Sequence, residues 1–161
     1  YSGEMKHVLI SADVIDSNGQ LITLTNEELE LGYRTSKVQT EDMVILGARL
    51  GLKKGNPQVI KEKMNDLSYR RRSKQPLTLP SAGSTFKRPE GCFAGKLIMD
   101  AQLSGCRIGD AAVSEKHCGF VVNMGKATSK EVMELIHYIQ DTVKDQFGKD
   151  LHPELKVIGE D

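Results

Sequence analysis

The chain has 161 residues, and its 22 lysines and arginines equal its 22 aspartates and glutamates, so its formal net charge at pH 7 is zero. This length suffices for one ordinary domain or two small lobes, and the balanced charge excludes a general attraction to nucleic acid or to an anionic membrane. No apolar run approaches the ~20 residues of a membrane span and no signal-peptide pattern is present, so we expect a soluble protein with a small-molecule or protein partner.

The N-terminal third is predicted to be rich in strands. The chain begins at Tyr1 without a methionine, and we expect that processing or truncation removed what came before. Residues 5–15 and 20–25 are two β-capable runs on either side of an Asn-Gly pair, which predicts a hairpin. The capping-box spacing that starts at Thr25 predicts a short helix. The apolar run at 43–52 is typical of a central strand.

A longer helix is expected to follow. Asn56 and Pro57 have the preferred types for an N-cap and a first helical position. The expected apolar face of this helix consists of Val59, Ile60, Met64 and Leu67. The helix ends in the basic sequence "YRRRSK", and Pro76 and Pro80 then bracket an extended link. The composition changes after this link, which indicates a boundary between two lobes.

The second lobe is predicted to contain short elements and then one clear helix. Residues 91–127 alternate short apolar runs with glycines. Thr128 and Glu131 form a capping box, and Gly148 stands where a C-terminal cap belongs. The apolar positions of this helix recur at helical spacing: Val132, Ile136, Ile139, Val143 and Phe147. A last strand is predicted at 155–159.

These elements predict an α+β fold with three parts. Residues 1–74 form a strand-rich lobe, residues 75–148 form an α/β lobe, and residues 149–161 form a terminal strand. A terminal strand of this kind can complete the sheet of the first lobe, and it would then carry Glu154 towards Arg34.

Common metal and nucleotide motifs are absent from the sequence. The spacings of Cys92, Cys106 and Cys118 fit neither a CxxC pair nor a zinc site, so we expect reduced thiols in a reducing compartment. No pair of histidines has metal-ligand spacing, and His117 suits either a binding residue or a hydrogen-bonded structural residue. The glycines form neither GxGxxG nor a Walker loop.

Three polar residues are candidates for chemistry. Ser84 follows a glycine in a loop that can approach a ligand closely, although the pattern is not GxSxG and a turn serine is the simpler interpretation. Arg34 has a planar guanidinium that could hold a carboxylate in two hydrogen bonds, or it could be a solvated helix end. Glu154 begins an apolar segment, where it could be buried and paired or simply exposed.

Basic residues flank the serine loop on both sides. Lys74, Lys87 and Arg88 would suit a ligand that carries phosphate groups. A solvated, charged surface is the alternative interpretation of the same cluster.

Five sequence strings, in this order, resemble one family of enzymes. They are "GYRTSKVQ", "QPLTLPSAGSTFKRP", "FAGKLI", "AAVSEKHCGFVVN" and "HPELKVIGED". They are similar to motifs of the UDP-N-acetylenolpyruvoylglucosamine reductases, the MurB family of peptidoglycan precursor synthesis. The resemblance covers essentially the whole chain. The opening "YSGE" resembles the end of a flavin-domain motif of that family, which implies a C-terminal half that lacks the N-terminal flavin lobe.

The resemblance implies a reaction and its cofactors. In that family NADPH reduces FAD, and the flavin delivers hydride to the enolpyruvyl double bond of UDP-N-acetylglucosamine enolpyruvate. It further implies a cytoplasmic monomer that acts on a UDP-sugar, with no nucleic-acid or membrane partner. The rival interpretation is a non-catalytic UDP-sugar-binding module.

The resemblance also implies roles for individual residues. Ser84 matches the family's proton donor, and Arg34 and Glu154 match the residues that flank the substrate's carboxylate end. Lys74 matches a lysine that contacts the UDP portion, across a loop of slightly different length. Arg88 matches a position where other members of the family have an asparagine or an arginine near the substrate. Departures from the family pattern include an aspartate at position 110, where a glycine is usual.

Overall fold

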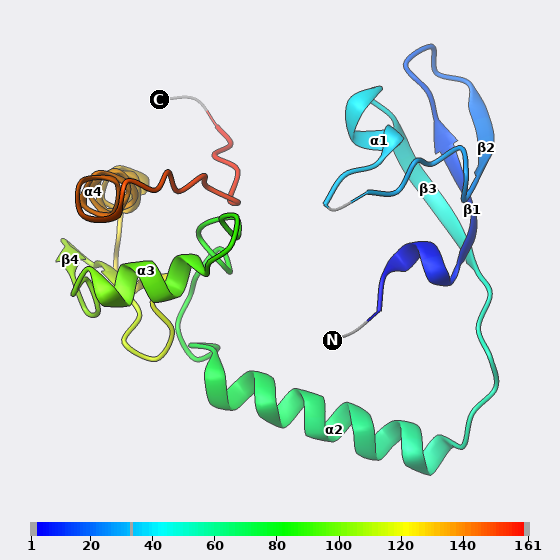
Figure 1. Cartoon of the computed structure of the whole chain (residues 1–161). Coiled ribbons are helices and arrows are strands. Elements are labelled where there is room, and N and C mark those ends of the chain that lie inside the picture. The colour runs from blue at the N-terminus through cyan, green and yellow to red at the C-terminus, as the bar shows by residue number, and fades with distance from the viewer. Residues whose placement is uncertain (1–2, 33, 160–161) are drawn as a thin grey trace. The chain divides into compact units, whose positions relative to one another are not determined.

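The chain forms two compact units, each with its own small sheet. The computed structural model describes residues 3–32 and 34–159. The units are Tyr1–Ile60 and Lys61–Asp161, and each contains one three-stranded antiparallel sheet together with helices (Figure 1). The predicted α+β class is confirmed.

The division between the units lies inside helix α2. This helix spans Pro57–Lys74, and the first unit ends at Ile60. The sequence placed the boundary at the end of the same helix. The organisation into 1–74, 75–148 and 149–161 therefore stays a prediction.

A hairpin forms the centre of the first unit. Strands β1 (Leu9–Ile15) and β2 (Leu21–Thr25) pair antiparallel, as the Asn-Gly turn signal predicted. The Asp16 carboxylate closes the turn, because its Oδ1 accepts hydrogen bonds from the backbone N–H groups of Asn18 at 2.9 Å and Gln20 at 2.8 Å. The small core beneath the sheet consists of Ala12, Val14, Leu24 and Leu29.

The expected central strand lies at an edge of the described sheet. Among the described residues, strand β3 (Val44–Leu50) pairs only with β1, and the strand order is β2-β1-β3. Its apolar side chains are exposed rather than buried on both faces, with Val44 60% and Leu46 57% accessible. An apolar run on both faces is typical of a strand covered on both sides, and within the described part of the chain β1 holds the central position instead. The unit also contains the short helices η1 (Met5–His7) and α1 (Lys37–Thr40).

The helix predicted after β2 does not form, although its capping box does. The Thr25 N–H donates to Glu28 Oε2 at 2.8 Å, and the Glu28 N–H donates to Thr25 Oγ1 at 3.3 Å. Only turns follow, because Glu30 adopts a φ of +47°, outside the right-handed helical region. The prediction of a helix here was wrong.

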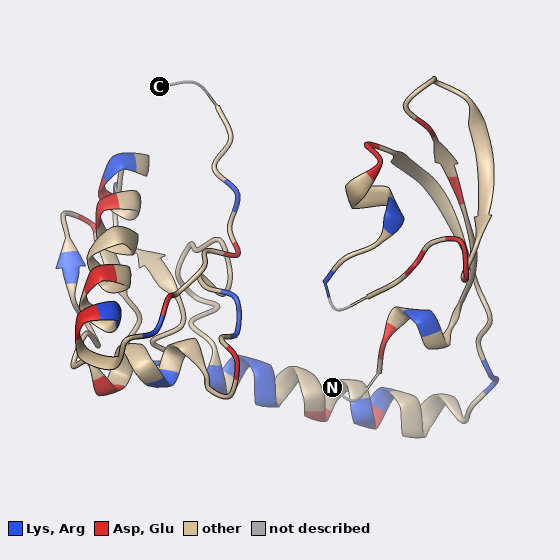
Figure 2. Ribbon diagram, turned by 45° about the horizontal axis from the view of Figure 1, so that its top comes forward, with Lys and Arg blue, Asp and Glu red and all other residues tan. Residues whose placement is uncertain are grey.

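Helix α2 begins as predicted. Asn56 Oδ1 accepts a hydrogen bond from the Gln58 N–H at 2.9 Å, which satisfies one of the unpaired donors of the first turn. The expected apolar face remains accessible, with Val59 60% and Met64 64% exposed. Figure 2 shows charges of both signs along this helix.

The second unit joins a small sheet to two helices. Strands β4 (Arg107–Ile108), β5 (Ala111–Val113) and β6 (Val121–Asn123) form an antiparallel sheet in the order β4-β5-β6. Helices α3 (Ala94–Asp100) and α4 (Ser129–Phe147) belong to the same unit. Its core draws on both helices and on the segments beside the sheet, and its fully buried members include Ile98, Leu135, Ile136, Ile139 and Val143.

Helix α4 has the start and end that the sequence predicted. The Thr128 N–H donates to Glu131 Oε2 at 2.7 Å, and the Glu131 N–H donates to Thr128 Oγ1 at 3.2 Å, so the capping box is complete. Gly148 closes the helix at a φ of +62°, and its N–H donates to the Lys144 carbonyl oxygen.

The predicted terminal strand at 155–159 does not form. Within the described residues the C-terminal segment makes one isolated antiparallel bridge, between Pro153 and Phe86 of the same unit. Leu151 is buried there, and its carbonyl oxygen accepts a hydrogen bond from Gln140 Nε2 at 2.7 Å. No strand is assigned at the apolar residues Leu155, Val157 and Ile158, so the apolar pattern alone was a misleading signal.

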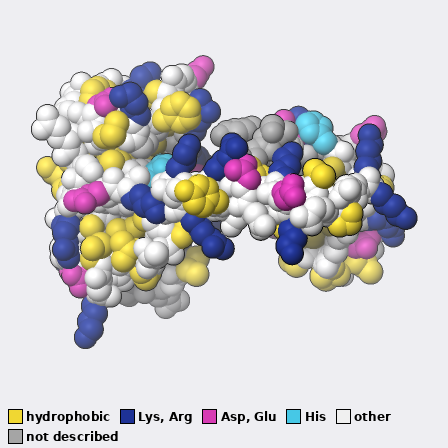
Figure 3. Space-filling view, turned by 90° about the horizontal axis from the view of Figure 1, so that it is seen from below, with side chains coloured by type: hydrophobic (Ala, Val, Ile, Leu, Met, Phe, Trp, Pro, Cys, Tyr) yellow, Lys and Arg dark blue, Asp and Glu magenta, His cyan; other side chains and the backbone are white. Residues whose placement is uncertain are grey.

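The surface gives no indication of a membrane span. Among the residues that the structure describes, no helix is long and apolar enough to cross a bilayer. On the face drawn in Figure 3, lysines and arginines lie among acidic and hydrophobic side chains.

Candidate active site

Ser84 lies in an exposed loop whose shape depends on the preceding glycine. Gly83 adopts a φ of +87°, in the left-handed region that strains any other residue. No surrounding atom would contact a Cβ built on Gly83, so the backbone conformation and not lack of space requires glycine here. The Ser84 hydroxyl donates a hydrogen bond to the Phe86 carbonyl oxygen at 3.3 Å.

The residues after Ser84 pair with the C-terminal segment. The Glu154 N–H donates to the Thr85 carbonyl oxygen at 2.9 Å, and the Lys87 N–H donates to the His152 carbonyl oxygen at 2.8 Å. Glu154 itself is half-buried. The fold therefore places side by side the backbone segments that carry Ser84 and Glu154, two of the three candidate catalytic residues, which are distant in sequence.

Arg34 belongs to the first unit. It is exposed and adopts a φ of +56°, an uncommon value outside glycine that often marks a turn or a functional site. A bridge between Gly32 and Thr35 closes the turn. Within this unit, Arg34 lines a cavity of about 340 Å³ together with Glu4 and Ser36.

Lys74 and Arg88 both lie on the surface of the second unit. Lys74 is the last residue of α2 and is exposed. The guanidinium carbon of Arg88 lies 4.0 Å from the centroid of the Phe93 ring, which is a cation–π contact. A guanidinium over a ring keeps its N–H donors directed sideways, so Arg88 is orientated to bind an acceptor.

A cavity of about 380 Å³ lies next to the segment that follows Lys74. Its polar lining includes Arg107, Ser114 and Lys116, and its apolar lining includes Leu79. Lys116 Nζ donates to the Arg72 carbonyl oxygen at 2.6 Å, which places this cation near the end of α2. Sequence reasoning did not select Arg107 or Lys116, because each stands alone among glycines and short apolar runs.

Another cavity of the second unit, a groove of about 350 Å³, lies beside the serine loop. It is lined by Ala82, by Leu155 and by the first turn of α4, including Thr128 and Val132. Ala82 lies two residues before the serine, and Leu155 directly follows Glu154. The groove is therefore lined by the two segments that carry Ser84 and Glu154, although not by these two side chains themselves.

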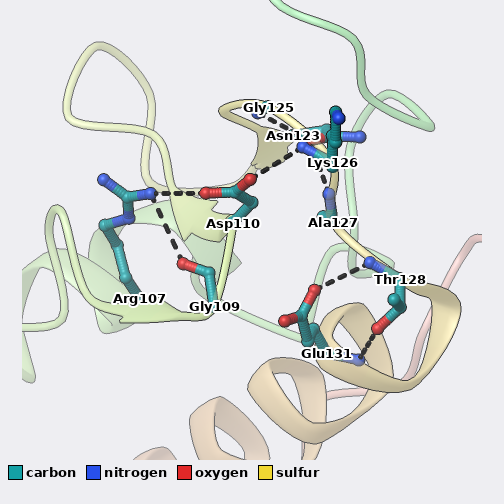
Figure 4. Close-up of polar contacts among 9 residues, drawn as sticks. All are labelled: Arg107, Gly109, Asp110, Asn123, Gly125, Lys126, Ala127, Thr128 and Glu131. Atoms are coloured by element: carbon teal, nitrogen blue, oxygen red, sulfur yellow. Dashed lines mark hydrogen bonds and ion pairs between the residues drawn. The ribbon is translucent and has the colours of Figure 1, made fainter.

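Asp110, an aspartate where the family pattern suggested glycine, organises the turn before α4 (Figure 4). Its Oδ2 accepts a hydrogen bond from the Lys126 N–H at 2.7 Å, and its Oδ1 lies 3.1 Å from Arg107 Nη2. Asn123 Oδ1 accepts from the Gly125 N–H at 2.9 Å in the same turn. The aspartate thus supports the local backbone that leads to the capping box.

The described residues contain no group of three or more His, Cys, Asp or Glu side chains that could hold a metal ion. Cys92 and Cys106 are half-buried free thiols, and Cys118 is a buried one.

Comparison with known proteins assigns the family. Residues 75–158, just over half of the chain, match the family described as "UDP-N-acetylenolpyruvoylglucosamine reductase, C-terminal domain". The chain belongs to the UDP-N-acetylenolpyruvoylglucosamine reductase family. The resemblance that the sequence strings indicated is confirmed.

Individual members of this reductase family are similar over the whole chain. The chain is 56% identical to UDP-N-acetylenolpyruvoylglucosamine reductase of Clostridium perfringens and 52% identical to that of Exiguobacterium sibiricum. Each alignment covers 100% of this chain and 53% of the relative. The crystal structure of the reductase from Thermus caldophilus matches with a TM-score of 0.80 at 33% identity, over 96% of this chain and 54% of that one. The chain thus spans about half the length of the reductases that it matches.

Proposed function

We propose that the chain supplies the substrate-recognition and proton-donating residues of a UDP-N-acetylenolpyruvoylglucosamine reductase. The reaction would reduce UDP-N-acetylglucosamine enolpyruvate to UDP-N-acetylmuramate. The observation that carries this proposal is the backbone pairing of Thr85 with Glu154, which places the serine loop beside the segment of Glu154 in a chain of this family.

Ser84 would act as the proton donor. Addition of hydride to one carbon of the enolpyruvyl double bond leaves negative charge on the other carbon, next to the substrate carboxylate. The O–H bond of Ser84 would break as its proton forms a C–H bond there, and solvent would then reprotonate the alkoxide. Because the hydroxyl donates to the Phe86 carbonyl in this structure, it must turn from that acceptor towards the substrate.

Glu154, a carboxylic acid, and Arg34, a cation, would support this step in different ways. A guanidinium stabilises the developing enolate and can hold the substrate carboxylate in two parallel hydrogen bonds. A carboxyl group close to the serine can hydrogen-bond the reacting groups and adjust their acidity. Both assignments rest on matching positions in the family motifs and on the geometry within each unit.

The basic residues around the second unit's larger cavity would bind the diphosphate. Lys74 precedes the segment that lines this cavity, and Arg107 and Lys116 contribute cations to its wall. Arg88, orientated by Phe93, would contact the sugar portion. Apolar lining with a few polar groups is the usual character of a small-molecule site.

FAD and NADPH belong to the proposal, but the described residues do not fit a complete flavin site. The first unit holds a cavity of about 340 Å³, at the low end of the range of about 300–1,000 Å³ for small-molecule pockets. A dinucleotide as large as FAD needs a longer site than this. When bound, FAD would supply the hydride, and the half of the family proteins without a counterpart here would provide most of its contacts. We further propose a cytoplasmic, monomeric enzyme.

Calorimetric titration of this chain with UDP-N-acetylglucosamine enolpyruvate tests substrate recognition. We expect saturable binding that weakens by about tenfold in Lys74→Ala and Lys116→Ala, since each removes one charge-assisted hydrogen bond of roughly 1.5 kcal/mol. Ser84→Ala should bind within about twofold of the unchanged chain, because the serine acts in the proton transfer.

Two outcomes would contradict this assignment. If both lysine variants bind the substrate as tightly as the unchanged chain does, the cavity lined by Arg107 and Lys116 is not where the diphosphate binds. Tight binding with no turnover after addition of the N-terminal half of a relative would favour the alternative, a non-catalytic UDP-sugar-binding module.

A further inference from the structure

Thr85, the residue after the candidate proton donor, is tied to two other segments at once. It is only 2% exposed. Its N–H donates to the Gly119 carbonyl oxygen at 2.8 Å, and its Oγ1 accepts a hydrogen bond from the Val121 N–H at 2.9 Å. Its carbonyl oxygen accepts from the Glu154 N–H at 2.9 Å. The backbone and the side chain of one buried residue thus join the serine loop, strand β6 and the C-terminal segment.

The partner side of this junction is itself held in place. The Gly119 N–H donates to His117 Nδ1 at 3.2 Å, and the His117 ring packs edge-on against Phe120 at a centroid distance of 5.1 Å. A Cβ on Gly95 would lie 3.1 Å from the Gly119 nitrogen, so α3 passes close to the same peptide. Gly119 therefore offers Thr85 a carbonyl oxygen whose position is fixed by its neighbours.

We propose that Thr85 is a positioning residue for the proton transfer, through the hydrogen bond that its hydroxyl accepts from Val121. This inference rests on the proposed role of Ser84. Adjacent Cα atoms are about 3.8 Å apart, so a fixed Thr85 confines the serine to the reach of one peptide. The same residue accepts a hydrogen bond from the Glu154 N–H, and so it also sets the separation between the serine loop and the Glu154 backbone.

The side-chain hydroxyl is the specific part of this arrangement. A valine has nearly the same shape as threonine, but it would leave the buried Val121 N–H without its acceptor. A shift of β6 relative to the serine loop, in search of another acceptor, is the expected result. Small displacements of a reacting group have large kinetic effects, with a misplacement of 1 Å costing up to about a hundredfold in rate.

The test compares two half-reactions in a complete reductase that contains this chain. Reduction of FAD by NADPH needs no proton from Ser84, whereas reoxidation by UDP-N-acetylglucosamine enolpyruvate does. In stopped-flow measurements, Thr85→Val should slow reoxidation on the order of tenfold or more while flavin reduction keeps its rate. Thr85→Ser keeps the hydroxyl and should recover most of the reoxidation rate.

Ser84→Ala is the reference variant, and it separates the two proposals. If Ser84→Ala slows reoxidation and Thr85→Val does not, the positioning role is overturned and the role of the serine stands. If Ser84→Ala reoxidises at the unchanged rate, both are overturned. Equal slowing of both half-reactions in Thr85→Val would reveal a general loss of structure and would also overturn the positioning role.

A second readout uses this chain without cofactor. Amide hydrogen exchange followed by NMR should show faster exchange at Val121 and Glu154 in Thr85→Val, with slow exchange retained in Thr85→Ser and at Ile139 in helix α4. Unchanged exchange at Val121 and Glu154 in Thr85→Val would contradict the proposal.

Discussion

At the residue scale, Gly109, in the turn between β4 and β5, shows how closely that turn packs against the first turn of α4. A Cβ on Gly109 would overlap the Glu131 carboxylate, and its φ is +55°. We expect Gly109→Ala to destabilise the second unit by about 2–3 kcal/mol, since it adds backbone strain and disturbs the capping box. Urea unfolding followed by circular dichroism measures this.

The matched control is Gly148→Ala at the end of α4. Gly148 has a similar φ of +62°, but no atom lies close to its missing Cβ. Strain alone should cost about 1 kcal/mol there. Equal losses of unfolding free energy in the two variants would contradict the prediction, because they would mean that the Glu131 side chain moves away from the new Cβ without destabilising the unit.

A second residue-scale prediction concerns pH and the hairpin turn. Hydrogen bonds from the backbone N–H groups of Gln20 and Asn18 lower the pKa of Asp16 below its ordinary value of 3.8. Because the folded-state pKa is lower than the unfolded one, this carboxylate stabilises the hairpin above about pH 3.8, and its contribution is lost as the pH falls through the lowered pKa. NMR titration of the Asp16 carboxyl carbon should give a midpoint below that of the same aspartate in a short unfolded peptide of this sequence. A midpoint equal to that of the peptide would contradict the turn geometry.

At the scale of elements, helix α4 holds the core of the second unit. Ile139 is fully buried, whereas its neighbour Tyr138 is 48% exposed. Ile139→Ala should destabilise the unit by about 2–5 kcal/mol, and Tyr138→Ala should stay within about 0.5 kcal/mol of the unchanged chain. Thermal unfolding followed by circular dichroism measures the difference. Similar shifts for the two variants would show that α4 does not use this face for packing.

At the scale of the whole molecule, the prediction is that this chain does not catalyse the reduction by itself. With added FAD, NADPH and UDP-N-acetylglucosamine enolpyruvate, NADPH oxidation should stay at the level of the buffer control. Addition of the N-terminal half of the Clostridium perfringens relative, which is 56% identical over the part that this chain covers, should restore turnover. Turnover by this chain without that half would refute the prediction.

Local signals predicted the local structure well. The Thr128 capping box, the helical spacing around Ile139 and Gly148 together gave both ends of α4, because each acts within one or two helical turns. The same capping signal at Thr25 produced hydrogen bonds but no helix, since the backbone of Glu30 departs from helical angles. Capping chemistry therefore marks a start, and only the following residues decide whether a helix continues.

Local signals did not predict which apolar segments are buried or which strands pair with each other. The apolar run of β3 predicted a central strand, yet β3 lies at an edge of the described sheet. The apolar segment after Pro153 predicted a strand, yet it forms none among the described residues. Whether an apolar segment finds a strand partner depends on contacts with distant segments, which no local pattern contains.

The sequence by itself determined the family, the α+β class and the candidates Arg34, Ser84, Glu154, Lys74 and Arg88, because these depend on residue types in a fixed order. The tertiary structure alone decided that the Glu154 backbone pairs with Thr85, and that a buried hydroxyl joins both to β6. The physical reason is that hydrogen bonds between segments dozens of residues apart form only when the core has packed. A pattern of residues can predict each segment, but the neighbours of a segment follow from the whole fold.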